Sequence, residues 1–299
     1  MKNPTAILTG DIHLREDQPT CRLDDFWEAQ SKAINWLRKL QEKHQCLILD
    51  AGDLFHKWRS SNFLARWAIL NLPNNMITLW GNHDTPYHNL NNYEKSILGV
   101  LAASGRLKVI RESTLTTFDD LDLGMVYFPW GTEPAPISPV FSYNIAVMHT
   151  MVYKGKTPWP GCTAPNARQL LTQMRGFDLV VTGHNHRTFV EEHKGRLLVN
   201  PGSLTQQTAD QADHKPCVFL WDAEHNEVEQ VFLPIEEGVV SREHIDVENE
   251  KNERLSAFIE RMNKDIEVEL SFEKNLERYL ESNKVRKGTK NILSEVLNG

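Results

Sequence analysis

The sequence predicts an α/β fold in which two sheets are flanked by helices and followed by a helical C-terminal appendage. Three observations support this class. Up to Gly105, short apolar runs alternate with longer segments of helical periodicity, which indicates a largely parallel sheet covered by helices. From about residue 107 the apolar runs are short and closely spaced, which favours a second, mixed or antiparallel sheet. Beyond about residue 238 the chain is highly charged and helix-prone.

The first half provides three strands and three helices. The segment 24–43 is the clearest helix, because apolar residues such as Phe26, Ala33 and Leu37 recur close to the 3.6-residue period. Each expected strand is a short apolar run that ends at a glycine or at a polar residue. We expect strands over 5–9, 46–50 and 76–80, and helices over 24–43, 63–72 and 94–104.

The second half is expected to consist of short strands joined by loops. The stretch Pro129 to Pro139 contains four prolines and is therefore a loop, and Val152 to Pro165 is another. We expect the strands of the second sheet over 107–110, 114–118, 123–128, 144–148, 178–182, 188–191, 196–199, 216–222 and 227–233.

A domain boundary is expected at Pro234 to Gly238. Residues 1–237 would form one domain, and residues 238–299 would form a helical tail. The tail either binds a partner, forms a homodimer or covers the domain. Its hydrophobic pattern predicts helices over about 241–264, 271–283 and 289–297.

Composition restricts the class of protein. The chain has 299 residues, of which 40% are hydrophobic and 24% are charged, so neither wholesale disorder nor a fibrous repeat is expected. No apolar run approaches the ~18 residues that span a bilayer, and Lys2-Asn3-Pro4 does not open a secretory signal. The four cysteines are scattered and form no CxxC pair, which argues against a disulfide scaffold. We therefore expect a cytoplasmic protein with reduced thiols.

The net charge also limits the type of binding surface. With 33 basic and 40 acidic residues the chain carries a formal charge of −7, so it is not a polycation that would coat nucleic acid. A nucleic-acid enzyme remains open, because divalent metal ions supply locally the positive charge that the composition lacks.

Polar residues with metal-binding chemistry follow five of the expected strands. Open α/β sheets place their ligands at the carboxyl ends of the strands, and four of the five turns contain a glycine that allows close backbone approach. The five turns are Gly10-Asp11-Ile12-His13, Gly52-Asp53-Leu54-Phe55-His56, Gly81-Asn82-His83-Asp84, His149, and Gly183-His184-Asn185-His186.

Each turn has an ordinary structural interpretation when it is taken alone. An isolated Asp-x-His is usually a surface turn, His149 could be a satisfied core histidine, and Gly-Asn-His-Asp could be a hairpin turn. The conjunction of five such turns, each after its own strand, favours a metal site instead. Carboxylate, amide and imidazole donors without a thiolate suit a pair of Mn, Fe or Zn ions and suit calcium poorly. One carboxylate must bridge if two ions lie about 4 Å apart.

This ordered set of motifs resembles the calcineurin-like metallophosphoesterase superfamily. The resemblance covers roughly residues 5–235, and Asn200-Pro201-Gly202-Ser203 also occurs in that superfamily. Within it, Gly-Asp-Leu-Phe-His at 52–56 resembles the SbcD-type DNA exonucleases of double-strand-break repair. The resemblance implies a two-sheet sandwich flanked by helices, with two divalent ions at one edge. We expect Mn²⁺, with Mg²⁺, Fe²⁺ or Zn²⁺ as alternatives.

The resemblance also implies residue roles. The first ion would take Asp11, His13, Asp53 and His186, and the second would share Asp53 and take Asn82, His149 and His184. Three further residues would be catalytic: His83 would stand near the scissile phosphate, Asp84 would orient it, and His56 would touch the phosphate or a neighbouring nucleotide.

Side chains near these motifs have two interpretations. Trp58, Arg59, Trp67 and Trp80 either stack on an unpaired base or belong to the core. Three basic residues flank the metal turns and either contact DNA phosphates or face solvent: Lys154, Lys156 and Arg187.

The expected function is metal-dependent cleavage of phosphodiester bonds in DNA, by an exonuclease or an endonuclease. One alternative is hydrolysis of small nucleotides, cyclic nucleotides or phosphoproteins, which the acidic net charge favours. Another is a non-catalytic scaffold with a vestigial metal site, against which the intact motif set counts. SbcD-like nucleases carry a capping domain and then a helical segment that binds a coiled-coil ATPase. The roughly 60 residues after Gly238 are too few for both, so an SbcC-like ATPase and a homodimer stay open as partners.

Overall fold

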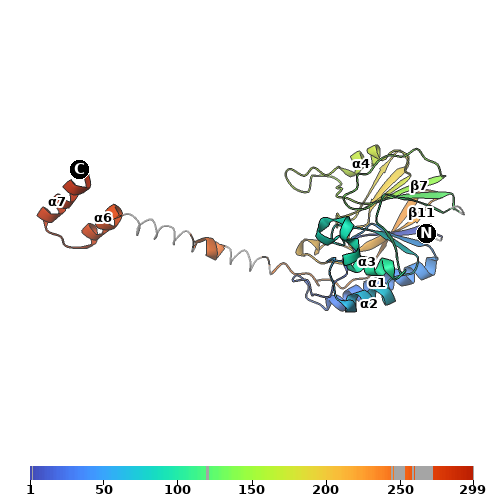
Figure 1. The fold of residues 1–299 in the computed structure, drawn as a ribbon, viewed down its shortest axis with the longest axis horizontal. Coiled ribbons are helices and arrows are strands. Elements are labelled where there is room, and N and C mark those ends of the chain that lie inside the picture. The colour runs from blue at the N-terminus through green and yellow to red at the C-terminus, as the bar shows by residue number, and fades with distance from the viewer. Residues whose placement is uncertain are drawn as a thin grey trace. The chain divides into compact units, whose positions relative to one another are not determined.

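The computed structural model describes residues 1, 3–118, 121–243, 245, 253–257, 259 and 272–298. The chain divides into two compact units, Met1–Ser241 and Arg242–Gly299 (Figure 1). All of the residues predicted to form the metal site lie in the first unit.

The first sheet has six strands in the order β12-β11-β1-β2-β3-β4. Strands β1 to β4 run parallel to one another, whereas β11 is antiparallel to β1 and β12 is antiparallel to β11. The strands are β1 (Ala6–Thr9), β2 (Leu47–Asp50), β3 (Met76–Leu79), β4 (Lys108–Ile110), β11 (Cys217–Asp222) and β12 (Glu227–Phe232).

The second sheet also has six strands, in the order β5-β6-β7-β8-β10-β9. The strands β6, β7, β8 and β10 are parallel, and the two edge strands β5 and β9 pair antiparallel. The strands are β5 (Leu115–Phe118), β6 (Leu123–Phe128), β7 (Tyr143–His149), β8 (Leu179–Gly183), β9 (Phe189–His193) and β10 (Arg196–Asn200).

The two sheets pack face to face. Because side chains alternate along a strand, Ala6 and Leu8 of β1 point between the sheets, where they join residues such as Val147 and Val181 of the second sheet. Ile7 points to the opposite face of the first sheet and packs against the helices there. The fold is therefore the α/β sandwich that the sequence predicts, with both sheets mixed.

Helices cover the outer face of each sheet (Figure 1). Helices α1 (Phe26–His44), α2 (Asn62–Asn71) and α3 (Ile97–Ala103) lie on the first sheet, and α4 (Ala167–Gln173) lies on the second. α1 begins where the side chain of Asp25 accepts a hydrogen bond from the backbone N–H of Glu28, and it buries one apolar stripe that includes Ala33, Ile34 and Leu37.

Two expectations about the elements are corrected, and one helix was not predicted. The runs 107–110, 216–222 and 227–233 were expected in the second sheet, but they form β4, β11 and β12 of the first. The helix expected over 94–104 is a 3₁₀ segment, Leu90–Lys95, followed by α3, because the side chain of Ser96 caps a new helix at the N–H of Gly99. The sequence also gave no sign of α4, which is only seven residues long.

The second unit contains two described helices, α6 (Phe272–Ser282) and α7 (Lys287–Asn298), where helices were expected over 271–283 and 289–297. Residues 253–257 and 259 are helical, and most of the helix expected over 241–264 lies outside the described residues. Among the helices that the structure describes, none combines the length and the apolar character that crossing a membrane requires.

Candidate metal centre

The five polar turns meet at one edge of the sandwich. The turns after β1, β2 and β3 come from the first sheet, and those after β7 and β8 come from the second. Two groups of the expected ligand atoms result, each within 4.8 Å of one another: Asp11, His13 and His186 form one group, and Asp53, His149 and His184 form the other. The ring nitrogens of His13, His56 and His83 meet the same distance and form a third group, which overlaps the first at His13. The structure thus brings together the acidic and imidazole residues that the sequence predicts as metal ligands.

Asp53 connects these groups, and Asn82 joins the second of them. The Oδ2 atom of Asp53 lies 3.3 Å from Nε2 of His149 and 3.7 Å from Nε2 of His13, so one carboxylate faces both groups. The Oδ1 atom of Asn82 lies 2.9 Å from Nε2 of His149 and 2.8 Å from Nδ1 of His184. Asn82 therefore belongs with the second group, and Asp53 occupies the position that a bridging carboxylate needs.

The orientation of His149 shows that the second group suits a cation. Its Nδ1 lies 2.7 Å from the carbonyl oxygen of Ala51, which can only accept, so this nitrogen carries a proton. Nε2 then points toward Asp53 and toward the amide oxygen of Asn82. Without a metal this nitrogen carries a proton that it donates to these oxygens, in line with its raised pKa. With a metal ion in place of that proton, its lone pair would join those of the oxygens.

The first group gives the same result. The Nε2 atoms of His13 and His186 face each other at 3.0 Å, and the side chains of His13 and Asp11 are buried. Asp11 accepts hydrogen bonds from the backbone N–H of His184, with both oxygens at 3.0 Å. A set of buried oxygen and imidazole donors without thiolate fits divalent transition-metal ions such as Mn²⁺.

The electrostatics of the protein alone reflect this concentration of charge. Burial raises the pKa of Asp11, and Asp53 adds to this effect, although His186 and His149 oppose it. Burial also acts to raise the pKa of Asp53, but His149, His13 and His83 outweigh it and hold this pKa below its ordinary value. Two buried carboxylates therefore lie in one site, where each destabilises the charge of the other.

The histidines respond in different directions. Burial lowers the pKa of His13 well below its ordinary value, and burial together with His149 lowers that of His184 to about 4. These two rings are thus neutral at pH 7, the form that binds metal. His149 is the exception, since Asp53 and Asp11 overcome the effect of burial and raise its pKa to about 9.

The backbone is strained at the ligands. Asp11, His13, Asp53 and His184 have φ between 49° and 81°, in the left-handed region that residues with a side chain rarely adopt. Such strain is typical of functional sites, where the surrounding structure enforces it. The glycines are equally constrained: a Cβ on Gly81 would overlap the carboxylate of Asp53.

His83 and His56 lie beside the two groups of ligands. The His83 ring centroid is 4.7 Å from that of His13 and 5.5 Å from that of His56. The rings of His83 and His56 are stacked, with an angle of 28° between their planes. Nδ1 of His83 donates to the backbone carbonyl of His56 at 2.8 Å, so Nε2 of His83 is left unprotonated when the ring is neutral. Burial and Arg15 lower the pKa of His56 to about 4.

Asp84 differs from its expected role. Its carboxylate accepts hydrogen bonds from the backbone N–H groups of Leu54, Phe55 and Gly81 at 2.9–3.3 Å, and the His83 ring is held by the His56 carbonyl instead. Burial and Asp53 raise the pKa of Asp84 to about 8. Asp84 thus ties the second turn to the third and positions His83 through the backbone only.

Sequence reasoning missed residues that hold the turns from outside. The side-chain N–H₂ of Gln207 donates to the carbonyls of Ile12 and His13 at 3.2 and 3.1 Å, which fixes the first turn. Asn200 donates to the carbonyls of Asn185 and Arg187, which fixes the turn after β8. The Asn-Pro-Gly-Ser motif indicated Asn200 without its role, and no sequence pattern indicated Gln207.

A cleft of about 610 Å³ adjoins the ligands His184 and His186. Its walls include Trp159, which is half exposed, and the basic residues Lys154, Lys156 and Arg187. Lys154 is engaged with the carbonyl of Val190 and with Glu191. Lys156 and Arg187 are the remaining basic side chains of this wall.

Of the other residues near the motifs, Trp80 is buried in the core and Trp67 packs against Trp27. Trp80 is therefore not available to stack on a base, whereas Trp67 keeps part of its surface exposed. Trp58 is half-buried and contacts Tyr87, and Arg59 is exposed.

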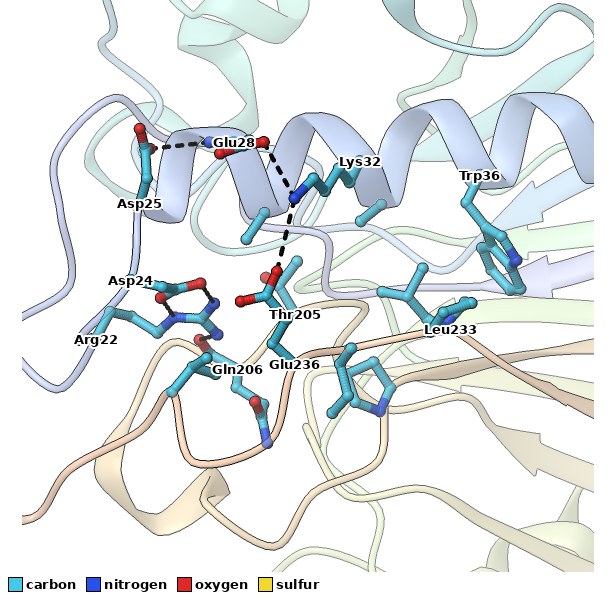
Figure 2. A pocket seen from close by; sticks show the side chains of 16 residues that line it. Arg22, Asp24, Asp25, Glu28, Lys32, Trp36, Thr205, Gln206, Leu233 and Glu236 are labelled. Carbon is cyan, nitrogen blue, oxygen red and sulfur yellow. Dashed lines mark hydrogen bonds and ion pairs between the residues drawn. The ribbon is translucent and has the colours of Figure 1, made fainter.

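A second cavity of about 460 Å³ lies between α1 and the segments 205–206 and 233–239 (Figure 2). Both of its basic side chains are paired, since Lys32 lies 3.1 Å from Glu28 and 3.7 Å from Glu236, and Arg22 pairs with Asp24. The predicted site residues do not line this cavity, and we assign no chemistry to it.

The fold and the donor set define a metal-dependent phosphoesterase. The chain belongs to the calcineurin-like phosphoesterase superfamily, whose domain model matches residues 6–226. No curated protein matches the sequence.

Solved structures with a similar fold are distant. An archaeal phosphodiesterase is 15% identical over 76% of this chain and 99% of its own, with a TM-score of 0.41. A Staphylococcus aureus protein described as a 5′-nucleotidase is 16% identical over 79% of this chain and 54% of its own, with a TM-score of 0.46. Vps29 from Cryptosporidium parvum is 16% identical over 78% and 97%, with a TM-score of 0.36.

Proposed function

We propose that this metallophosphoesterase cleaves phosphodiester bonds in DNA, as an SbcD-like exonuclease or endonuclease. The observation that carries the proposal is the stacked pair of His56 and His83 at the side of the metal ligands. His83 by itself is sufficient for proton transfer. A second, neutral imidazole next to it supplies a further contact for a phosphate or for a neighbouring nucleotide, which a small monoester does not need.

The adjoining cleft supports a polymeric substrate. A polynucleotide presents a phosphate on each side of the bond that is cut, and Lys156 and Arg187, which line the cleft, would contact one of them. Trp159 on the same wall offers an apolar surface to a sugar or a base. The formal charge of −7 favours a small substrate instead, but local ions and these side chains set the charge at the site.

Different residues of the chain would bind the metal ions and transfer the proton. Asp11, His13, Asp53, Asn82, His149, His184 and His186 would hold two divalent ions, Mn²⁺ by preference. Divalent ions in such a site activate water at neutral pH and offset the negative charge of the phosphoryl oxygens. His83, with Nδ1 fixed by the His56 carbonyl, directs Nε2 for proton transfer to the leaving oxygen once that nitrogen is protonated.

The test is hydrolysis with Mn²⁺ of end-labelled single-stranded and double-stranded DNA beside bis-p-nitrophenyl phosphate. We expect cleavage of DNA by the purified chain and its loss in His83→Ala prepared in parallel, which excludes a contaminating nuclease. The ladder of products gives the polarity. Turnover of the small ester with DNA intact, in the presence and absence of the candidate ATPase partner, would contradict the proposal and favour a small nucleotide substrate.

We also propose that the C-terminal unit binds a partner, either an SbcC-like coiled-coil ATPase or a second copy of the chain. Helix α6 has apolar residues at helical spacing (Leu276, Tyr279 and Leu280), and Tyr279 and Ile292 are exposed. Light scattering of the purified chain distinguishes a homodimer from a monomer that awaits a different partner.

A further inference from the structure

Two loops of the candidate centre lead into one aromatic pair. Trp58 follows His56 by two residues, and Tyr87 follows His83 by four. The ring centroids of Trp58 and Tyr87 are 5.0 Å apart, with the planes inclined at 53°. Two residues of chain span at most about 7 Å, so the Trp58 backbone lies close to that of His56. The aromatic pair therefore lies on the same two loops as the stacked histidines.

The exposure of this pair is not explained by packing. The Tyr87 side chain is 71% exposed, whereas an aromatic ring that stabilises a loop buries most of its surface. Trp58 is half-buried, and its carbonyl accepts a hydrogen bond from the N–H of Ile97 at 2.9 Å, which anchors its loop to the start of α3. An anchored, partly covered tryptophan with an exposed tyrosine against it forms a platform whose outer surface faces solvent.

The backbone beneath the platform is strained. Tyr87 and the next residue, His88, have φ of 53° and 54°, two consecutive left-handed conformations without a glycine. The rings consequently diverge: Tyr87 packs on Trp58, and His88 packs on Trp130 with centroids 5.2 Å apart. Strain of this kind persists where a loop is held for a function rather than for stability.

We propose that Trp58 and Tyr87 form a stacking subsite for the base of an unpaired nucleotide next to the phosphodiester that is cleaved. This inference rests on the proposed function and specifies its substrate. Every nucleobase has an aromatic face, so an exposed aromatic pair binds it without regard to sequence. A base inside a duplex is already stacked on its neighbours, so the subsite takes a single strand or a frayed end.

The first experiment measures stacking without catalysis. A single-stranded phosphorothioate oligonucleotide that contains 2-aminopurine is titrated with the full chain and Mn²⁺, and quenching of the fluorescent base reports stacking. We expect quenching by the wild type and by Tyr87→Phe, which keeps the aromatic face. Tyr87→Ala should bind about 10-fold more weakly, within the range of one lost stacking contact. Phe232→Ala removes an exposed aromatic side chain on β12 and serves as the matched control.

The second experiment identifies the source of the base. We compare kcat/KM for an oligonucleotide, for the same oligonucleotide with an abasic residue beside the cleaved bond, for thymidine 5′-p-nitrophenyl phosphate and for bis-p-nitrophenyl phosphate. Tyr87→Ala should lower kcat/KM for the substrates that contain a base by about 10-fold relative to kcat/KM for the bis-ester. The change should come from a higher KM. The abasic oligonucleotide should be cut equally by both proteins.

The outcomes are distinct. Equal quenching by the wild type, Tyr87→Ala and Trp58→Leu, with all three folded by circular dichroism, would overturn the subsite. A defect that Tyr87→Phe shares would also overturn it, because the hydroxyl rather than the ring would then matter. Quenching that depends on Tyr87 together with intact DNA would contradict the nuclease and keep the subsite, with turnover of the thymidine ester indicating a free nucleotide.

Discussion

Asp53 is placed between the two groups of metal ligands, with one oxygen within 3.7 Å of an imidazole nitrogen from each group. Its other oxygen accepts a hydrogen bond from the backbone N–H of His83 at 2.9 Å. One carboxylate thus connects the ligands of both expected ions to the residue expected to move a proton. The prediction at this residue concerns charge, because an amide of the same shape keeps the contacts but cannot bridge two cations.

We predict that Asp53→Asn abolishes metal-dependent hydrolysis of bis-p-nitrophenyl phosphate and lowers the number of bound ions, as measured by calorimetry and elemental analysis. Asp25→Asn is the matched control, since Asp25 caps α1 and asparagine caps a helix equally well. Full activity of Asp53→Asn with two ions bound would refute the bridging role.

His83 offers a second test at the scale of a residue. Its Nδ1 is held by a carbonyl oxygen, so its Nε2 is the atom available to a substrate. We predict that His83→Ala binds both ions with unchanged stoichiometry and loses at least about 100-fold in kcat, the scale of lost acid–base catalysis. Loss of an ion in this variant would instead make His83 a ligand.

At the scale of elements, the carboxyl ends of β1, β2, β3, β7 and β8 could be predicted to carry the site, because each is an apolar run that ends in a polar turn. Sheet membership could not be predicted for β4, β11 and β12. Strand pairing depends on which long-range partner closes the sheet, and a short apolar run has the same pattern in either sheet. The helix α4 was not predicted for a related reason, since its seven residues form only two turns, which are too few to show a helical period.

The contacts within the centre divide in the same way. Residue types and spacing predict which side chains are ligands, but they do not predict hydrogen bonds between turns from different strands. The resemblance implies that Asp84 orients the adjacent His83, whereas in the structure Asp84 binds three backbone N–H groups of two turns. Gln207 was missed because its contact with the first turn spans almost the whole domain.

The glycines that allow the turns to approach one another give a prediction at this scale. A methyl group on Gly81 would collide with the Asp53 carboxylate, whereas one on Gly288 would meet no atom within 4 Å. We predict that Gly81→Ala weakens Mn²⁺ binding by about 10- to 100-fold, as displaced ligand positions do, and that Gly288→Ala does not. Calorimetric titration with Mn²⁺ measures both, and equal affinities would show that the turn relaxes.

For the whole molecule, the concentration of buried carboxylates implies that ions stabilise the fold. Asp11 and Asp53 are both buried in one site, and removal of bound cations leaves only the neighbouring histidines to offset their charges. We predict that Mn²⁺ at 100 times its dissociation constant raises the free energy of unfolding by about 2.7 kcal/mol for each ion bound, and thus Tm by about 5–10 °C per ion. Differential scanning fluorimetry with Mn²⁺ and with EDTA checks this, and an unchanged Tm would argue against a metal centre.

The division of the chain leads to a prediction about truncation. All predicted site residues, and every backbone contact of Cys21 and Leu23 with 239–241, lie within Met1–Ser241. We predict that a chain ending at Ser241 hydrolyses the small ester at a rate similar to that of the full chain but no longer binds a partner or dimerises. Loss of hydrolysis in a truncated chain that melts cooperatively would assign part of the site to the second unit.

The order of strands in the first sheet also governs how the protein is made. β1 occupies the interior of the sheet, yet Ala6 lies opposite Trp221, which is synthesised at the far end of the domain. One edge of the parallel strands therefore stays unpaired until β11 leaves the ribosome, and pairs of such high sequence separation form slowly. During synthesis that open edge is the region most exposed to wrong pairing with other chains, so we expect chaperone dependence to end only when β11 and β12 close the sheet.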